Sequence, residues 1–153
     1  MSFMSLFTKG KEVEAVLFSP LEGKITYQGK PVTGAKIKLK VAWKDQDGET
    51  EFYQTDNQGN FNIPKKTMTY TENPLVQLVI KQRLTVFFEN QEFYIWRLSK
   101  MEEAIFTELG GRPINLICEL TNDERTVRGN GSLGGTRCTW DALDEAVNLN
   151  ERN

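Results

Sequence analysis

Apolar and polar residues alternate most regularly over residues 35–41. Every second position of this stretch is apolar and every position between is a lysine: Ala35, Lys36, Ile37, Lys38, Leu39, Lys40 and Val41. Side chains of a β-strand point alternately to opposite faces, so a period of two puts the apolar residues on one face and the lysines on the other. The pattern predicts a strand with one face in a core and the other in water.

Short runs of β-favouring residues recur along the rest of the chain and are divided by Gly, Pro, Asn and Asp. Their spacing of roughly 8 to 14 residues is typical of a β-sandwich or barrel. We expect further strands over residues 23–27, 49–55, 61–64, 75–80, 84–88, 92–98, 114–120 and 124–128. The four glycines within residues 129–135 indicate an exposed loop.

Helical spacing appears in two short segments. Three apolar residues at i, i+3 and i+4 predict a short helix near residues 100–108: Met101, Ala104 and Ile105. Three more share one helical face near the C-terminus: Trp140, Leu143 and Val147. The chain has no internal repeat and no linker. We therefore expect a single domain, with an N-terminal extension over 1–20, a β-sandwich over 21–140, and a short C-terminal helix and tail over 141–153.

A series of motifs between residues 23 and 63 resembles a known family. The motifs are Gly23-x-Ile25-x-Tyr27, Gly29-Lys30-Pro31-Val32-x-Gly34-Ala35-x-Ile37-x-Leu39 and Thr55-Asp56-x-x-Gly59-x-Phe61-x-Ile63. They resemble the carboxypeptidase regulatory-like domain, which is a transthyretin-like (prealbumin-like) Greek-key β-sandwich of seven strands. The resemblance implies an all-β fold of about seven strands, in which these residues shape turns and the inward face of a sheet.

Later segments resemble the ending of a family of short, functionally uncharacterised bacterial proteins that contain this sandwich. These segments are residues 92–96, 109–113, 118–120, 131–133 and 138–140. This second resemblance implies no chemistry. The same superfamily includes hydrolases of 5-hydroxyisourate, whose sites need histidines and a C-terminal Tyr-Arg-Gly-Ser. This sequence has neither feature, so we do not expect that hydrolase activity.

Composition excludes many kinds of active site. With 0 His and 2 Cys, the 153-residue chain cannot form a Ser-His-Asp triad, a Cys-His pair, a His-ligated zinc site or a four-cysteine zinc site. The chain has 19 Lys+Arg and 21 Asp+Glu and so a net charge of -2, which argues against a general nucleic-acid or anionic-membrane binder. We expect no catalytic residue, no metal and no cofactor.

The N-terminus and the two cysteines are the features of the sequence that bear on its cellular compartment. No basic start followed by a continuous apolar run appears over residues 1–20, and no stretch approaches the roughly 18 apolar residues of a membrane span. We expect a cytoplasmic protein with no membrane insertion, and export by a non-classical route is the alternative. Cys118 and Cys138 fit either two buried thiols in a reducing compartment or a disulfide in an oxidising one.

The lysine stripe over residues 36–40 has two interpretations. Alternate strand residues are about 6.8 Å apart, so the stripe fits a phosphate backbone or an acidic partner. A solvated sheet face with lysines that discourage aggregation explains it equally simply, and we favour this interpretation.

Two acidic clusters also have a functional and a structural interpretation: Asp45, Asp47 and Asp56 at turns, and Glu102, Glu103 and Glu108 in the expected helix. The aspartates fit calcium ligands, but their spacing is too short for a calcium loop and turn chemistry explains them. The glutamates fit an acid/base pair, but a helix exterior explains them without one.

Large aromatic residues occur on both faces of the expected central strands. Phe87 and Phe88 are consecutive, so one of them must face away from the core. On the next expected strand Tyr94 and Trp96 alternate with Phe93 and Ile95, so one of these two pairs must also face away from the core. Either the C-terminal helix or residues 89–108 cover these outward-facing residues, or they form an exposed patch that binds a partner. The candidate partner-binding residues are Tyr94, Trp96, Trp140, Leu143 and Val147.

The sequence thus predicts a non-catalytic protein-interaction or accessory module. The family resemblance implies an adaptor, a chaperone or an immunity-type partner of a secreted bacterial effector. The alternatives are a β-sandwich that binds a carbohydrate or a metal through loops at one end and, least favoured, a hydrolase. The partner would be another protein of unknown identity, with no nucleic acid involved, and the sequence does not determine an oligomeric state.

Overall fold

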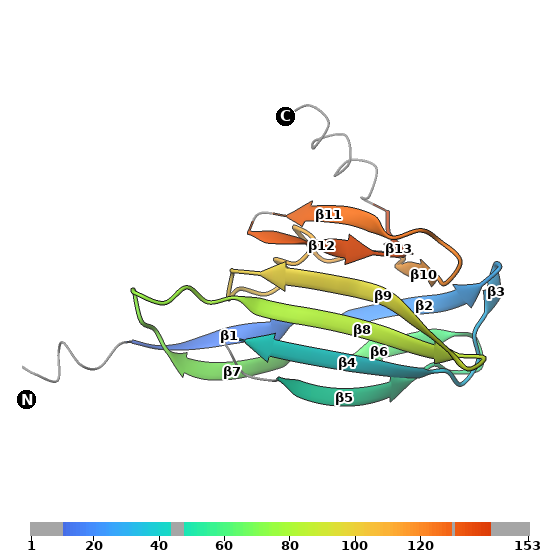
Figure 1. The fold of residues 1–153 in the computed structure, drawn as a ribbon, viewed down its shortest axis with the longest axis horizontal. Helices are drawn as coiled ribbons and strands as arrows, with labels where there is room; N and C mark the ends of the chain where they lie inside the picture. The colour runs from blue at the N-terminus through green and yellow to red at the C-terminus, as the bar shows by residue number, and fades with distance from the viewer. Residues whose placement is uncertain (1–10, 44–47, 130, 142–153) are drawn as a thin grey trace, which may run out of the picture.

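The computed structural model describes residues 11–43, 48–129 and 131–141 of the chain, and these residues form an all-β, sandwich-like molecule (Figure 1). They contain thirteen strands, arranged in sheets of six, five and two strands. The described residues contain no helix, and therefore none that is long and apolar enough to cross a bilayer.

The six-stranded sheet is antiparallel throughout and has the order β11-β12-β9-β8-β4-β5. Its strands are β4 (Lys36–Trp43), β5 (Glu49–Gln54), β8 (Ile80–Phe88), β9 (Gln91–Lys100), β11 (Arg125–Gly129) and β12 (Ser132–Thr136). The pattern over residues 35–41 correctly predicts β4, because its apolar residues are buried and its lysines lie on the opposite face. β5 and β11 are the two edges of this sheet.

The five-stranded sheet packs behind the six-stranded one and is centred on β2. It contains β2 (Leu21–Tyr27), β3 (Lys30–Pro31), β6 (Asn60–Ile63), β10 (Ile117–Glu119) and β13 (Cys138–Thr139). β10 runs parallel to β2, and the other pairs in the sheet are antiparallel. A separate ribbon pairs β1 (Glu12–Phe18) with β7 (Lys66–Thr71). The sequence pattern predicts no strand in either segment of this ribbon.

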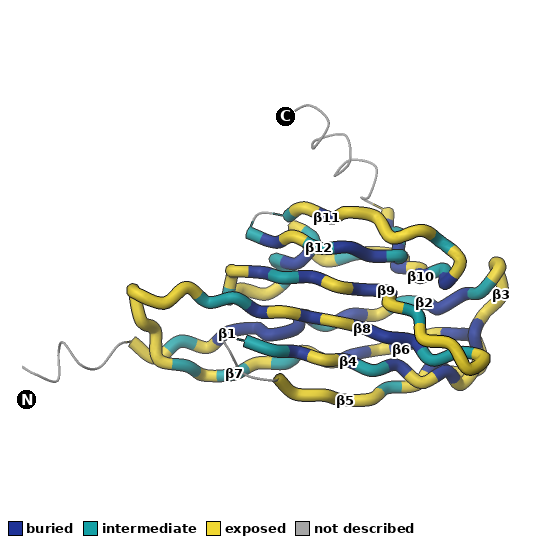
Figure 2. Tube along the Cα trace, in the orientation of Figure 1, coloured by how far each residue is buried: buried dark blue, intermediate teal, exposed yellow. Residues whose placement is uncertain are grey.

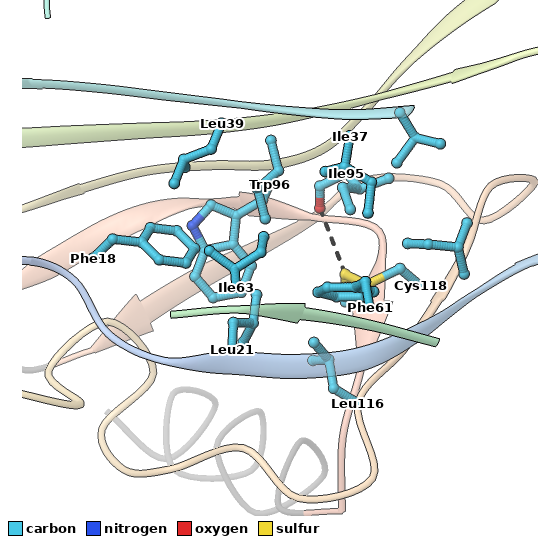
Figure 3. Packing of buried hydrophobic residues seen from close by; sticks show 14 of the residues in the cluster. Phe18, Leu21, Ile37, Leu39, Phe61, Ile63, Ile95, Trp96, Leu116 and Cys118 are labelled. Carbon is cyan, nitrogen blue, oxygen red and sulfur yellow. Dashed lines mark hydrogen bonds between the residues drawn. A yellow bond between two sulfur atoms is a disulfide. The ribbon is translucent and has the colours of Figure 1, made fainter. Parts of the chain in front are cut away.

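The main core lies between the two larger sheets. Side chains from β4 and β9 meet side chains from β2 and β6, and Phe18 from β1 packs against Trp96 with ring centroids 6.3 Å apart (Figure 3). Leu39, Ile63 and Ile95 are fully buried. Figure 2 shows that burial is concentrated along these inner strands, whereas β5 and the connection before β8 are largely exposed.

A β-bulge in β9 changes which aromatic residues face the core. Leu84 pairs with Trp96 and the next residue, Thr85, pairs with Tyr94, so Ile95 has no partner in β8. The extra residue interrupts the period of two. Ile95 and Trp96 therefore both point inward, with 0% and 2% of their surfaces exposed, while Tyr94 points outward.

The predicted strand over residues 75–80 is wrong for most of its length, because β8 begins only at Ile80. The preceding residues form a turn, in which the Leu75 N–H donates to the Asn73 side-chain oxygen at 3.0 Å and the Val76 N–H donates to the Asn73 carbonyl at 3.0 Å. Asn followed by Pro favours turn formation, and these local hydrogen bonds replace strand pairing.

The predicted helix near residues 100–108 is also wrong. β9 continues to Lys100, and the chain then turns irregularly as far as Gly110. Phe106 has a φ of 60°, which lies in the left-handed region and cannot continue a right-handed helix. The predicted C-terminal helix falls on residues 142–153, which lie outside the described residues.

The expected loop over residues 129–135 is mostly strand β12, which pairs with β9 on one side and β11 on the other. Gly134 allows this pairing, because a Cβ there would overlap the Arg97 carbonyl oxygen and lie 2.6 Å from the Leu98 Cα. The expected count of about seven strands is too low, because strands without a periodic pattern, such as β12, are not predicted from the sequence. Several strands in the described residues, such as β3 and β13, are too short to show a periodic pattern.

Candidate functional site

Positively charged side chains gather on the outer face of the six-stranded sheet. Residues directly opposite each other on neighbouring strands share a face. The register places Lys38 opposite Thr85 and Lys40 opposite Arg83, and Arg83 is in turn opposite Arg97. We call this surface the cationic face, and its positive residues are Lys36, Lys38, Lys40, Lys81, Arg83, Arg97 and Arg128. All are exposed except Lys38, which is half-buried.

Aromatic rings lie among these cations. Phe52 and Tyr94 expose 53% and 42% of their surfaces, and Phe87 is half-buried. The Lys36 Nζ lies 4.2 Å from the centroid of Phe52 and 5.8 Å from that of Phe87, and the Arg83 guanidinium carbon lies 5.4 Å from that of Tyr94. These cation–π contacts hold aromatic and charged groups together at the surface.

The centre of the cationic face is slightly concave. A hollow of 110 Å³ is lined by Lys38, Lys40, Arg83, Glu92 and Tyr94, among other residues. Arg97 is paired with Glu124 at 2.5 Å, and among the described residues none of the other six cations forms an ion pair. The face therefore presents unbalanced positive charge around an aromatic centre.

Of the predicted partner-binding residues, Tyr94 lies on this face. Trp96 does not, because the β9 bulge turns it into the core, where its Nε1 donates to Gln82 Oε1 at 3.0 Å. Trp140 is also buried, with 9% exposed. The structure thus corrects the expectation that these two tryptophans present a binding surface. Leu143 and Val147 lie outside the described residues.

Cys118 and Cys138 are joined by a disulfide. They are directly opposite each other on β10 and β13, with Cα atoms 3.9 Å apart, and both are fully buried. The Cys138 Sγ lies 3.8 Å from the Ile95 carbonyl oxygen, at the contact between the two sheets (Figure 3). Of the two alternatives left open by the sequence, the structure contains the disulfide.

A groove of 1040 Å³ lies on the opposite sheet. Strands β2 and β6 and the segment before β10 line it, and they contribute Lys24, Asn62 and Arg112 among other residues. Asp56 borders this groove, but its carboxylate accepts the Gln58 and Asn60 N–H groups, each at 2.9 Å, and so caps a turn. Asp45 and Asp47 lie outside the described residues, and no cluster of potential metal ligands occurs within those residues.

A buried polar network that no sequence pattern predicts lies at the end of β9. Glu108 was expected on a helix exterior, yet 4% of it is exposed and its Oε1 lies 3.0 Å from the Nζ of the fully buried Lys100. The Ser19 hydroxyl and N–H donate to the two oxygens of Glu108 at 2.8 and 2.9 Å. Every buried polar side-chain atom of the described residues has a hydrogen-bond partner, so this network has a structural role.

The structure therefore defines an all-β, sandwich-like protein with one strongly cationic sheet face. The chain belongs to a family described as "Domain of unknown function (DUF6795)", whose model matches residues 21–123. The matched residues include β4, β8 and β9, which provide most of the cationic face. Comparisons with curated proteins and with solved structures found no match.

Proposed function

We propose that this protein is a non-catalytic interaction module that binds an acidic partner protein through the cationic face. The observation that supports this proposal is the gathering of seven Lys and Arg side chains on one face of a chain whose net charge is -2. In this proposal, the protein would use this surface as an adaptor, a chaperone or an immunity-type partner of a secreted bacterial effector.

The composition of the face suits a protein interface. Aromatic residues and Arg are enriched in interface cores, and charge complementarity speeds encounter and selects the partner. Tyr94 and Arg83 would be the central contacts, because they line the hollow and contact each other. Lys36 and Lys81 would form a charged rim around them.

An acidic protein fits this surface better than a single-stranded nucleic acid. Nucleic acids bind such sheets by stacking bases on free aromatic faces. Here Lys36 lies over Phe52 and Arg83 lies over Tyr94, so the rings are already in contact with cations. Leu133, which is 53% exposed on the same face, adds apolar surface that a protein partner can cover.

We further propose a transthyretin-like Greek-key arrangement for this fold. From β2 the chain crosses to the other sheet, forms the β4–β5 pair, and returns as β6 beside β2. This crossing supports the arrangement that the family resemblance implies.

The disulfide supports the exported alternative for the compartment, because disulfides persist mainly in oxidising environments. Trapping thiols with an alkylating agent during isolation, followed by intact-mass analysis, tests this proposal. Two alkylated cysteines would favour the cytoplasmic alternative.

The binding proposal can be tested with a synthetic acidic peptide in which Glu alternates with Thr, so that its carboxylates repeat about every 6.8 Å, like the lysines of β4. Binding is measured by isothermal calorimetry with the wild type and with the double variant Lys38→Glu/Lys40→Glu. We expect the variant to bind at least about tenfold more weakly, which corresponds to about 1.4 kcal/mol.

The matched control is Lys30→Glu/Lys65→Glu, which makes the same change in net charge at exposed lysines outside the cationic face. An equal loss of binding in this control would show that net charge, not the face, determines binding and would overturn the proposal. Tighter binding of an oligothymidine of equal charge would instead identify a nucleic-acid surface.

A further inference from the structure

A second surface of this protein has the opposite charge. The connection from β7 to β8 and the segment just after β9 meet at one end of the molecule, beyond the six-stranded sheet (Figure 1). We call this surface the acidic tip, and the residues that define it are Glu72, Leu75, Val76, Met101, Glu102 and Glu103. They border a hollow of 550 Å³.

The acidic tip combines carboxylates with exposed apolar side chains. Leu75 exposes 92% of its surface, Val76 49% and Met101 47%. Glu72 and Glu102 are exposed, and neither forms an ion pair within the described part of the chain. Clustered apolar side chains with a charged rim are typical of interaction surfaces.

The tip and the cationic face are complementary in charge, and both also offer exposed apolar or aromatic side chains. The tip offers Leu75 and Val76 between carboxylates, and the face offers Tyr94 and a shallow hollow between lysines and arginines. The tip lies beyond one end of the sheet whose outer surface is the cationic face, and the two surfaces are formed by different residues. We infer that the acidic tip of one copy of this chain docks on the cationic face of a second copy.

This contact joins two different surfaces, so it is heterologous. Each copy that has docked its tip still offers its own face to another tip, and the contact therefore produces rings, of which a reciprocal pair is the smallest, or open chains. Because both surfaces are strongly charged, the contact weakens as salt shortens the Debye length from about 10 Å at about 0.1 M to about 3 Å at about 1 M. The inference rests on the proposed function in using the same cationic face.

The test is sedimentation velocity of the purified full chain over a range of concentrations. At about 0.1 M salt we expect the mean mass to rise above the 17.5 kDa of one chain as concentration increases, and to return to it at about 1 M salt. A wild type that stays at one chain's mass at every concentration in about 0.1 M salt would overturn the inference.

Exchanging the charges of the acidic tip and the cationic face tests whether this particular contact causes the association. The tip variant Glu72→Lys/Glu102→Lys and the face variant Lys38→Glu/Lys40→Glu each bring like charges together, so each alone should associate at least about tenfold more weakly than the wild type. Mixing the two variants places a positive tip against a negative face and should restore association. Failure of the mixture to associate, with both variants folded by circular dichroism, would overturn the inference.

The outcomes also separate this inference from the proposed function. If the acidic peptide binds the face and the chain does not self-associate, the proposed function stands and the inference fails. If the mixture associates and the peptide does not bind, the cationic face is a self-assembly surface and the proposed foreign partner is wrong.

Discussion

Glu108 is held in the interior by an ion pair with Lys100 and by hydrogen bonds from Ser19 and Gln82. Lys100 Nζ donates to its Oε1 at 3.0 Å, and Ser19 donates to both oxygens through its hydroxyl and its N–H. Burial acts to raise the pKa of the Glu108 carboxyl, but the charge of Lys100 and the donors of Ser19 outweigh burial and hold this pKa below its usual value. The ionised carboxylate thus ties residues 100–108 to Ser19, the residue that follows β1.

Removing one member of this buried ion pair should lower the free energy of unfolding substantially. We predict that Glu108→Ala lowers the free energy of unfolding by about 3 to 5 kcal/mol, because it leaves the Lys100 ammonium buried without its counter-charge. Adding Lys100→Met should recover part of this loss. Urea denaturation followed by tryptophan fluorescence measures both changes.

The exposed pair of Arg97 and Glu124 provides the comparison. Glu124→Ala should cost about 1 kcal/mol or less, because solvent screens exposed pairs. Equal costs for Glu108→Ala and Glu124→Ala would contradict the structural role assigned to the buried pair.

Glu119 joins two turns and makes stability depend on pH. Its carboxylate accepts hydrogen bonds from the Gly29 N–H at 2.7 Å, the Thr121 N–H at 2.9 Å and the Thr26 hydroxyl at 3.0 Å. Burial acts to raise its pKa, but the N–H groups of Thr121 and Gly29 and the two threonine hydroxyls outweigh burial and lower the pKa to about 2. The folded state therefore binds this proton less readily than the unfolded state, whose carboxyl has the ordinary pKa of 4.5.

A lowered pKa stabilises the fold above the unfolded value and loses this effect as pH falls toward the folded value. We predict that stability from Glu119 is complete above about pH 5 and disappears between about pH 4.5 and pH 2. Glu119→Gln, which cannot ionise, should be less stable than the wild type at neutral pH and should show a flatter decline over this range. Parallel declines in urea midpoints for the two proteins would refute the assignment.

At the scale of secondary-structure elements, β12 depends on the absence of side chains at two glycines. A Cβ at Gly134 would overlap backbone atoms of Arg97 in β9, whereas the atoms nearest to a Cβ at Gly135 belong to the side chain of Glu124. A backbone cannot move without breaking its ladder, but an exposed carboxylate can rotate away. Position 134 therefore requires a residue without a side chain for β12 to pair with β9, whereas position 135 tolerates a small side chain if the carboxylate of Glu124 moves.

We predict that Gly134→Ala lowers the free energy of unfolding by about 3 kcal/mol or more and that Gly135→Ala lowers it by about 1 kcal/mol. Thermal and urea melts of the two variants measure the difference. Comparable losses would mean that β12 does not approach β9 as closely as the structure indicates.

The same elements show what the sequence could and could not predict. β4 was predictable because lysine alternates strictly with buried aliphatic residues, so one periodic pattern encodes both of its faces. β12 was not, because Ser132, Gly134 and Gly135 have low strand propensity and the contacts with β9 that form the strand are distant in sequence. The bulge at Ile95 was equally hidden, since a single unpaired residue moved Trp96 from the expected surface into the core.

The cationic face was only partly predictable. Lys36, Lys38 and Lys40 were visible as a stripe, but Lys81, Arg83 and Arg97 join them only through strand register. The sequence also could not show that Glu102 and Leu75 meet at one end of the molecule, because no periodic pattern connects their segments.

On the scale of the whole molecule, charge is segregated although its sum is small. Positive residues gather on one sheet face and carboxylates gather at the tip, in a chain of net charge -2. A charged patch binds a matching surface even when the net charge has the wrong sign.

We therefore predict that the protein is retained on a cation-exchange resin at neutral pH and low salt. Lys38→Glu/Lys40→Glu should elute at clearly lower salt, because it removes positive charge from the centre of the face. Lys30→Glu/Lys65→Glu has the same net charge and should elute near the wild type. Identical elution of the two variants would show that the positive charge is not effectively concentrated on the cationic face.

The disulfide also determines how the molecule transmits force. Cys118 and Cys138 are 20 residues apart, and the covalent bridge encloses the whole β11–β12 hairpin. When the chain is stretched from its ends, covalent tension passes through the bridge, so the segment between the two cysteines is not extended. In optical tweezers, the extension gained on unfolding should be about 70 Å shorter for the oxidised protein than for the reduced one, which is the length of the shielded segment.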